Sequence, residues 1–162
     1  MMLVELNKIF SVEYGNKFDL NKMQPAMAYE DSIAFVGRSG QNNGCTAFVS
    51  KLEDVPPYEA GLITVALGGA ILSSFVQPRP FYTGQNVAVL RPIHEMDLAT
   101  KAYYCICITE NRHRYGAFGR EANRTLRTLM VPSRANVPAW VGKTFTKVVK
   151  EWTYELKAAL QD

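Results

Sequence analysis

The sequence predicts an α+β fold, in which a small β-rich core (a partly open barrel or a sandwich) is followed by flanking helices. Three observations support this class. Roughly six short β-prone runs, separated by turns rich in glycine, proline and asparagine, fill about the first ninety residues. After residue 95 the apolar residues recur at helical spacing instead. The chain also has 162 residues, 48% of them hydrophobic, which is enough to bury one core without a metal or a disulfide.

The β-prone runs can be placed in order from their composition and from the turns between them. The predicted strands, the first of which could also be helical, cover residues 3–6, 9–14, 32–36, 45–49, 62–67, 71–76 and 87–90. Turns are predicted at 15–17, 68–70 and 82–86. The 37–44 loop is rich in glycine and asparagine, and its Asn43-Gly44 pair suits positive φ angles. The strands on either side of this loop are therefore expected to form a hairpin.

Three helices are predicted in the second part of the chain. Asp97 is a suitable N-cap for the first, which is expected to end near residue 115. A short second helix is predicted over 121–129, stopped by Pro132. A C-terminal amphipathic helix over 143–162 carries an apolar stripe about 28 Å long at 1.5 Å per residue. The stripe consists of Phe145, Val148, Val149, Trp152, Leu156 and Ala159. The sequence therefore divides into a domain at 1–142 and a helix at 143–162.

The positive charge of the chain is concentrated in one block. Residues 1–111 hold 8 basic and 11 acidic side chains, whereas residues 112–150 hold nine lysines and arginines and a single glutamate. Five of the arginines lie between residues 112 and 127. A guanidinium group binds phosphate or guanine through two hydrogen bonds, so nucleic acid is the leading candidate partner. The alternatives are a solvated helix face and a protein–protein adaptor whose basic block binds an acidic partner.

No residue pattern predicts an enzyme, a cofactor or a metal. Cys105 and Cys107 lack a second pair of cysteines or histidines at metal-ligand spacing. The run at 55–58, Val-Pro-Pro-Tyr, resembles the Pro-Pro-Tyr motif of DNA amino-methyltransferases, but valine occupies the place of the required polar residue. The longest apolar run, 62–76, is shorter than the about 20 residues that span a bilayer, and the three cysteines suit a reducing cytosol. We therefore expect a cytoplasmic protein without membrane contact.

Four segments, taken in order, carry a resemblance to a known family. They are VELNKIF (4–10) with Tyr14-Gly15, FVGRSGQNNG (35–44), FYTGQNVAVL (81–90), and GREANRTL (119–126) with Val131-Pro132-Ser133. Through these segments the chain resembles a target-recognition domain of the specificity subunits of type I, and especially type IIB, restriction–modification systems. The resemblance implies a β-rich core with flanking helices that binds double-stranded DNA and performs no chemistry. It also implies a partner DNA methyltransferase, with or without a nuclease, that the domain directs to a short sequence.

The resemblance bears on the C-terminal helix as well. A usual specificity subunit holds two such domains, joined by long helices that pack antiparallel. This chain has one domain and one short helix, so it is either a half-subunit that dimerises or a part of a longer polypeptide. In the first case the stripe over 145–159 pairs with a second copy, and the dimer reads a symmetric site. The alternative is that the stripe packs on its own domain.

Sequence-specific DNA binding requires phosphate contacts for affinity and base-edge contacts for sequence. The arginine block can supply the first, and the 37–44 loop with the 85–86 turn can supply the second, because arginine suits guanine and amides suit adenine. The predicted DNA-binding residues are Arg38, Ser39, Gln41, Asn42, Asn43, Gln85, Asn86, Arg112, Arg114, Arg120, Asn123, Arg124 and Arg127. The alternative for the amides is that they only shape their turns. Tyr115 and Phe118 either stack on a flipped base or pack in the core. RNA binding is a third possible function, less well supported because the aromatic strand signature of common RNA-binding modules is absent.

Overall fold

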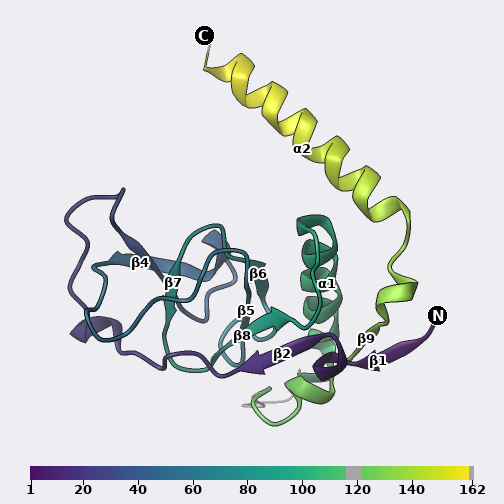
Figure 1. The fold of residues 1–162 in the computed structure, drawn as a ribbon, viewed down its shortest axis with the longest axis horizontal. Coiled ribbons are helices and arrows are strands. Elements are labelled where there is room, and N and C mark those ends of the chain that lie inside the picture. The colour runs from purple at the N-terminus through teal and green to yellow at the C-terminus, as the bar shows by residue number, and fades with distance from the viewer. Residues whose placement is uncertain (116–121, 161–162) are drawn as a thin grey trace.

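A computed structural model describes residues 1–115 and 122–160 of the chain (Figure 1). Its strands are β1 (Leu3–Glu5), β2 (Phe10–Glu13), β3 (Ile33–Val36), β4 (Cys45–Val49), β5 (Ile63–Ala66), β6 (Ser74–Val76), β7 (Phe81–Thr83), β8 (Val87–Pro92) and β9 (Met130–Pro132). Its α-helices are α1 (Leu98–Glu110) and α2 (Trp140–Ala159), and its 3-10 segments include Asn111–Tyr115 and Leu126–Thr128. The predicted α+β class is confirmed. Below, the body means residues 1–115 and 122–137.

The strands form three sheets, none of which closes into a barrel. One is antiparallel and four-stranded, in the order β2-β8-β5-β6. A second has the order β4-β3-β7, in which β3 pairs antiparallel with β4 and parallel with β7. The β3–β4 pairing confirms the predicted hairpin. The third sheet pairs β1 with β9 and thereby places the N-terminus beside the segment that leads to α2 (Figure 1).

The four-stranded sheet is the middle layer of the body, and alternate side chains of its strands enter different cores. Val65 and Leu90 pack in one core with Tyr104 of α1, whereas Val87 and Val89 pack in another with the β4-β3-β7 sheet. Period-two alternation along a strand explains this division. Tyr104 also donates from its hydroxyl to the Pro132 carbonyl at 2.9 Å, which ties α1 to β9.

The two largest differences from the strands predicted before residue 92 concern β7 and the start of β6. Residues 82–83, predicted as part of a turn, belong to β7, whose buried residues pair in parallel with β3. A parallel partner that comes much earlier in the chain leaves no local signal. The strand predicted from residue 71 begins only at Ser74. The residues before it form a tight turn in which Leu72 has a φ of +58°.

The predicted helix over 121–129 is wrong for the residues that the structure describes there. Residues 122–129 hold one 3-10 turn, Leu126–Thr128, and no α-helix. Contacts with the rest of the body explain this. The Ala122 N–H donates to the Leu67 carbonyl at 3.0 Å, and the Leu129 carbonyl accepts from the Leu6 N–H at 2.8 Å. The chain then enters β9, which the sequence did not predict.

The helix α2 begins at Trp140 and projects away from the body (Figure 1). Val141 is buried and Phe145 is half-buried, but Trp152 and Leu156 are 66% and 64% exposed. Beyond Phe145, the described part of the stripe does not pack on its own domain. The predicted domain boundary after residue 142 falls within the first turn of this helix. Neither described helix is both long and apolar enough to cross a membrane.

Candidate nucleic-acid interface

Three of the predicted DNA-binding residues, Arg38, Asn86 and Arg112, contact the turn between β5 and β6, residues 67–73. Gly69 in this turn has a φ of +63° and lies directly against Arg38. A Cβ added at Gly69 would lie 3.1 Å from both the Cβ and the carbonyl oxygen of Arg38. The next residue, Ala70, donates its N–H to the same carbonyl at 3.1 Å. Positive φ and close approach both favour glycine at position 69, and the contact seats the 37–44 loop on the turn.

The 37–44 loop combines a fixed backbone with exposed side chains. Asn42, Asn43 and Gly44 all have positive φ, as predicted for the last two of them. The Gly44 carbonyl accepts from the N–H of Gly37 at 2.9 Å, and the Asn43 carbonyl accepts from Nε2 of buried Gln77 at 2.7 Å. Nearer the start of the loop, the hydroxyl oxygen of Ser39 accepts from the Gln41 N–H at 3.1 Å. The side chains of Arg38, Gln41, Asn42 and Asn43 are exposed. The asparagines therefore shape the loop and also face solvent.

The 85–86 turn lies on the other side of the 67–73 turn. The Asn86 carbonyl accepts from the Leu67 N–H at 2.8 Å. The Asn86 side chain accepts from Nδ2 of Asn123 at 3.4 Å, which brings the arginine block beside this turn. Tyr14 also holds Asn123 in place, because the Tyr14 hydroxyl donates to the Asn123 carbonyl at 2.8 Å. Gln85 directly precedes Asn86, and Arg124 directly follows Asn123. Both of these neighbouring side chains are exposed.

The arginines of the basic block do not form one uniform patch. Arg112 donates from Nε to the Ile71 carbonyl at 2.9 Å and from Nη2 to the Ser73 hydroxyl at 2.8 Å. Arg127 donates from Nη2 to the Val12 carbonyl at 3.1 Å, and its guanidinium carbon lies 5.4 Å from the Tyr14 ring centroid. Arg120 lies outside the described residues, as does Phe118. The block therefore contains arginines that bind the body as well as arginines that extend from it.

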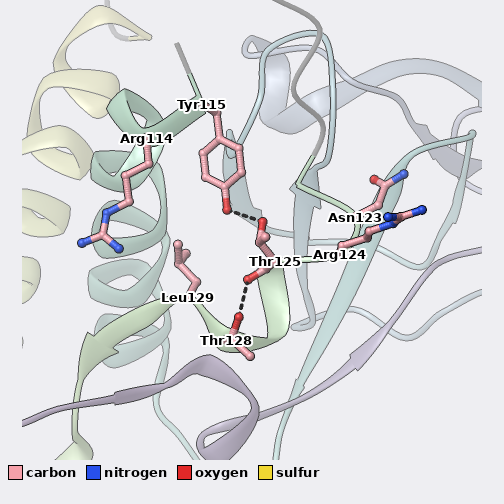
Figure 2. A pocket seen from close by; sticks show the side chains of 7 residues that line it. All are labelled: Arg114, Tyr115, Asn123, Arg124, Thr125, Thr128 and Leu129. Atoms are coloured by element: carbon pink, nitrogen blue, oxygen red, sulfur yellow. Dashed lines mark hydrogen bonds between the residues drawn. The ribbon is translucent and has the colours of Figure 1, made fainter. Parts of the chain in front are cut away.

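An open cavity of about 660 Å³ lies between Arg114 and Arg124 (Figure 2). It is lined by Arg114, Tyr115, Asn123, Arg124, Thr125, Thr128 and Leu129. Figure 2 shows the two guanidinium groups pointing to opposite sides of this cavity. The Tyr115 hydroxyl lies 2.6 Å from the Thr125 hydroxyl. The partly buried Tyr115 side chain packs against the core that contains Tyr104. Of the two alternatives for Tyr115, this contact supports packing.

The two cysteines and the 55–58 run, which the sequence analysis did not assign to catalysis, pack within the fold. Burial raises the pKa of the Cys105 thiol to about 12 and also raises the pKa of Cys107, so both thiols stay protonated at neutral pH. Tyr58 of the 55–58 run stacks on Phe81 with 5.4 Å between ring centroids. Among residues 1–115 and 122–160, no group of three or more histidine, cysteine or acidic side chains is placed to hold a metal ion.

Sequence reasoning missed two parts of this region. A turn was predicted only at 68–70, with strands on both sides, and nothing local signals that residues 67–73 contact residues 38, 86 and 112. The double glycine at 68–69 was the one available hint, because adjacent glycines permit close backbone approach. Tyr14 was noted for its place in the opening segment, but its bond to Asn123 joins residues far apart in the sequence.

Comparison with known proteins shows the fold to which this arrangement belongs. The S subunit of a type I restriction–modification system from M. genitalium is 15% identical with a TM-score of 0.65, over 97% of this chain and 42% of that chain. The HsdS subunit from Thermoanaerobacter tengcongensis is 13% identical with a TM-score of 0.60, over 98% and 39%. A chain from a structure on complex assembly and conformational transition of the type I R-M system is 14% identical with a TM-score of 0.64, over 99% and 42%.

These likenesses confirm that the chain has the fold of part of a type I S subunit, as its sequence segments suggested. The chain spans about two-fifths of the length of the structures it matches. No protein-family model matches the sequence, and no curated protein matches it significantly.

Proposed function

We propose that this chain is a target-recognition domain that binds a specific double-stranded DNA sequence within a restriction–modification system. The fold shared with S subunits supports this role. The observation that carries the proposal is that three segments hydrogen-bond to the 67–73 turn, through Arg38, Asn86 and Ala122. Arg38, Gln41, Gln85 and Arg124 are the exposed side chains of these segments on which the proposal depends. Arginine and glutamine read guanine and adenine edges in the major groove, and arginine also binds the phosphates beside them.

Within this surface, the 37–44 loop contacts bases. Arg38, Gln41, Asn42 and Asn43 extend from a backbone that hydrogen bonds hold in place, with Ser39 as one of the supports. A fixed backbone lowers the entropy lost when these side chains bind. Gln85 adds a second base contact from the neighbouring turn, and Asn86 supports it.

The phosphate contacts come from the arginine block. Arg114 and Arg124 extend on either side of the open cavity (Figure 2) and so can reach phosphates at separate points of the backbone. Arg127 and Asn123 bind the body and hold this segment in register. Arg120 remains a predicted phosphate contact outside the described residues.

The chain performs no chemistry in this proposal and acts in the cytoplasm. It directs a partner DNA methyltransferase, with or without a nuclease, to the bound sequence. The adaptor alternative, in which the basic block binds an acidic protein, receives no support from the comparisons.

The exposed stripe of α2 pairs antiparallel with α2 of a second copy. Trp152 and Leu156 are too exposed to be covered by the described part of the body. Residues 140–150 of the helix carry Lys143, Lys147 and Lys150, whereas residues 151–159 carry Glu151, Glu155 and Lys157. An antiparallel pair therefore places the net positive part of one helix beside the net negative part of the other. The matched S subunits are more than twice as long as this chain, which leaves room for two such units. A two-fold pair would read a symmetric site.

Selection from a randomised duplex pool tests the proposal. The purified chain should enrich one short sequence, and its affinity for that sequence should fall linearly on a plot of log affinity against log salt. The absence of any enriched sequence at low salt would contradict DNA recognition. Binding to an acidic protein without DNA binding would favour the adaptor instead.

Two variants separate base contacts from phosphate contacts. Arg38→Ala should relax the preference at one base position by about 1–3 kcal/mol, because a bidentate contact to guanine is lost. Arg124→Ala should weaken binding to all sequences and reduce the salt slope by about 0.9. Identical behaviour of the two variants would contradict this division of roles.

A further inference from the structure

We propose that Arg112 is a positioning residue for sequence recognition, and that it acts by holding the 67–73 turn beneath the 37–44 loop. The inference rests on the proposed DNA-binding function and refines it, because Arg112 belongs to the basic block that was expected to bind phosphate.

The turn contains a strained residue that needs support. Leu72 is fully buried and has a φ of +58°, a conformation that is costly for a leucine. Its own N–H donates to the Ala66 carbonyl at 2.7 Å, which closes the turn on β5. Such a conformation persists only where the surrounding contacts over-determine it.

The end of α1 and the 3-10 segment Asn111–Tyr115 that follows it supply those contacts to three successive residues. Thr109 donates from its hydroxyl to the Leu72 carbonyl at 3.0 Å. Arg112, one turn further along, binds the residue on each side, through the Ile71 carbonyl at 2.9 Å and the Ser73 hydroxyl at 2.8 Å. Arginine suits this task because Nε and Nη2 lie on one rigid plane and can reach two acceptors at once, which the single ammonium of lysine does less well.

The same turn also contacts the 37–44 loop. Ala70 donates to the Arg38 carbonyl at 3.1 Å, and Gly69 lies against Arg38. A Cβ added at Gly40 would lie 3.2 Å from the Ser73 hydroxyl, the group that Arg112 binds. The guanidinium of Arg112, the turn and the backbone of Arg38 to Gly40 are therefore in continuous contact. Loss of Arg112 should release the loop that carries the proposed base contacts.

The first experiment needs no DNA. Amide hydrogen exchange over 37–44 and 69–73 should be at least several-fold faster in Arg112→Ala than in the wild-type chain, while exchange in β8 stays unchanged. Arg114→Ala is the matched control, because it removes a neighbouring arginine that lines the open cavity (Figure 2). Unchanged exchange in Arg112→Ala would overturn the positioning role, whatever the chain binds.

The second experiment measures DNA binding by the same variants. Arg112→Ala should reduce the ratio of affinities for the selected and an unselected duplex by about tenfold while leaving the salt slope unchanged. Arg112→Lys should restore this ratio only in part. Ser73→Ala should show part of the loss, and the Arg112→Ala/Ser73→Ala double variant should lose no more than Arg112→Ala alone, since both remove one interaction.

Different failures point to different conclusions. If Arg112→Ala lowers the salt slope by about 0.9 and keeps the affinity ratio, Arg112 is a phosphate contact and the inference is wrong. If the wild-type chain selects no duplex at all, the proposed function fails, and the exchange experiment alone decides what Arg112 does within the fold.

Discussion

The body and α2 use apolar side chains in opposite ways. In the body, Phe10, Leu67 and Leu126 are fully buried in a core that α1 and the four-stranded sheet share. In α2 an equally regular apolar stripe faces solvent over most of its length, with Trp152 and Leu156 exposed. The difference teaches that an amphipathic pattern predicts a helix and its apolar face, but not where the partner of that face lies. For α2 we propose that the partner lies in another chain.

The largest expected difference is in the cost of truncating a leucine. Leu126→Ala should lower the free energy of unfolding by about 2–5 kcal/mol, because it removes a fully buried side chain and leaves a cavity. Leu156→Ala, its counterpart on α2, should change the unfolding of the monomer by less than about 0.5 kcal/mol. Urea unfolding at low protein concentration measures both, and equal losses would erase the distinction between the two regions.

Alkaline pH should destabilise the body through the buried face of α1. Burial raises the pKa of Cys105 from 9.0 to about 12 and that of Tyr104 from 10.0 to about 12. The unfolded chain therefore loses these protons first, so the stability is fully present below pH 9 and falls as the pH rises toward 12. Urea unfolding between pH 8 and 11 should show this fall, and Cys105→Ala should make the fall above pH 9 shallower, while partly buried Cys107 still contributes to it. A stability that is constant up to pH 11 would contradict it.

Association through α2 should be lost when its stripe receives a charge. Trp152→Asp should raise the dissociation constant of the dimer by at least about tenfold, because a carboxylate would be desolvated in an apolar contact. Tyr154→Asp is the matched control, since Tyr154 is also exposed but lies on the opposite side of the helix from Trp152. Sedimentation equilibrium measures both variants. A wild-type chain that stays monomeric at high concentration would show that something other than a second copy covers the stripe.

The smallest expected effect concerns the start of α1. The Asp97 carboxylate accepts from the Thr100 N–H at 2.7 Å, and this backbone hydrogen bond holds its pKa below the ordinary value. Asp97→Ala should cost about 0.5–2 kcal/mol as an N-cap is lost. The part of this stability that depends on charge is present above the ordinary carboxyl pKa and is lost as the pH falls through the lowered one. Asp97→Asn keeps the acceptor and should therefore remove the pH dependence with a smaller loss at pH 7.

Local patterns in the sequence predicted the parts of the fold that local chemistry determines. The hairpin around 37–44 and the cap at Asp97 are such parts, since glycine, asparagine and aspartate act there on their own backbone. β7 and β9 were not predicted, because each is a three-residue strand whose partner lies far away in the chain. The helix predicted over 121–129 was overridden, in its described part, by hydrogen bonds to Leu67 and Leu6.

The candidate site also has features that residue type predicts and features that depend on contacts between distant parts of the chain. Residue types alone indicated which side chains suit DNA, and the structure places Arg38 and Asn86 around a common turn. The sequence could not separate Arg112 and Arg127, which bind the body, from Arg124, which extends from it. That distinction depends on carbonyl groups of Ile71 and Val12, and a carbonyl group carries no sequence signature.

The pairing of β1 with β9 has a consequence for how the chain is made. Val4 lies opposite Val131, so β1 waits for a partner strand that is synthesised much later. Until Met130–Pro132 has left the ribosome, Val4 has no partner strand and the Tyr104 hydroxyl has no Pro132 carbonyl to bind. The body therefore closes only after Met130–Pro132 has been synthesised, and a nascent chain that ends before Met130 would leave β1 without its partner strand.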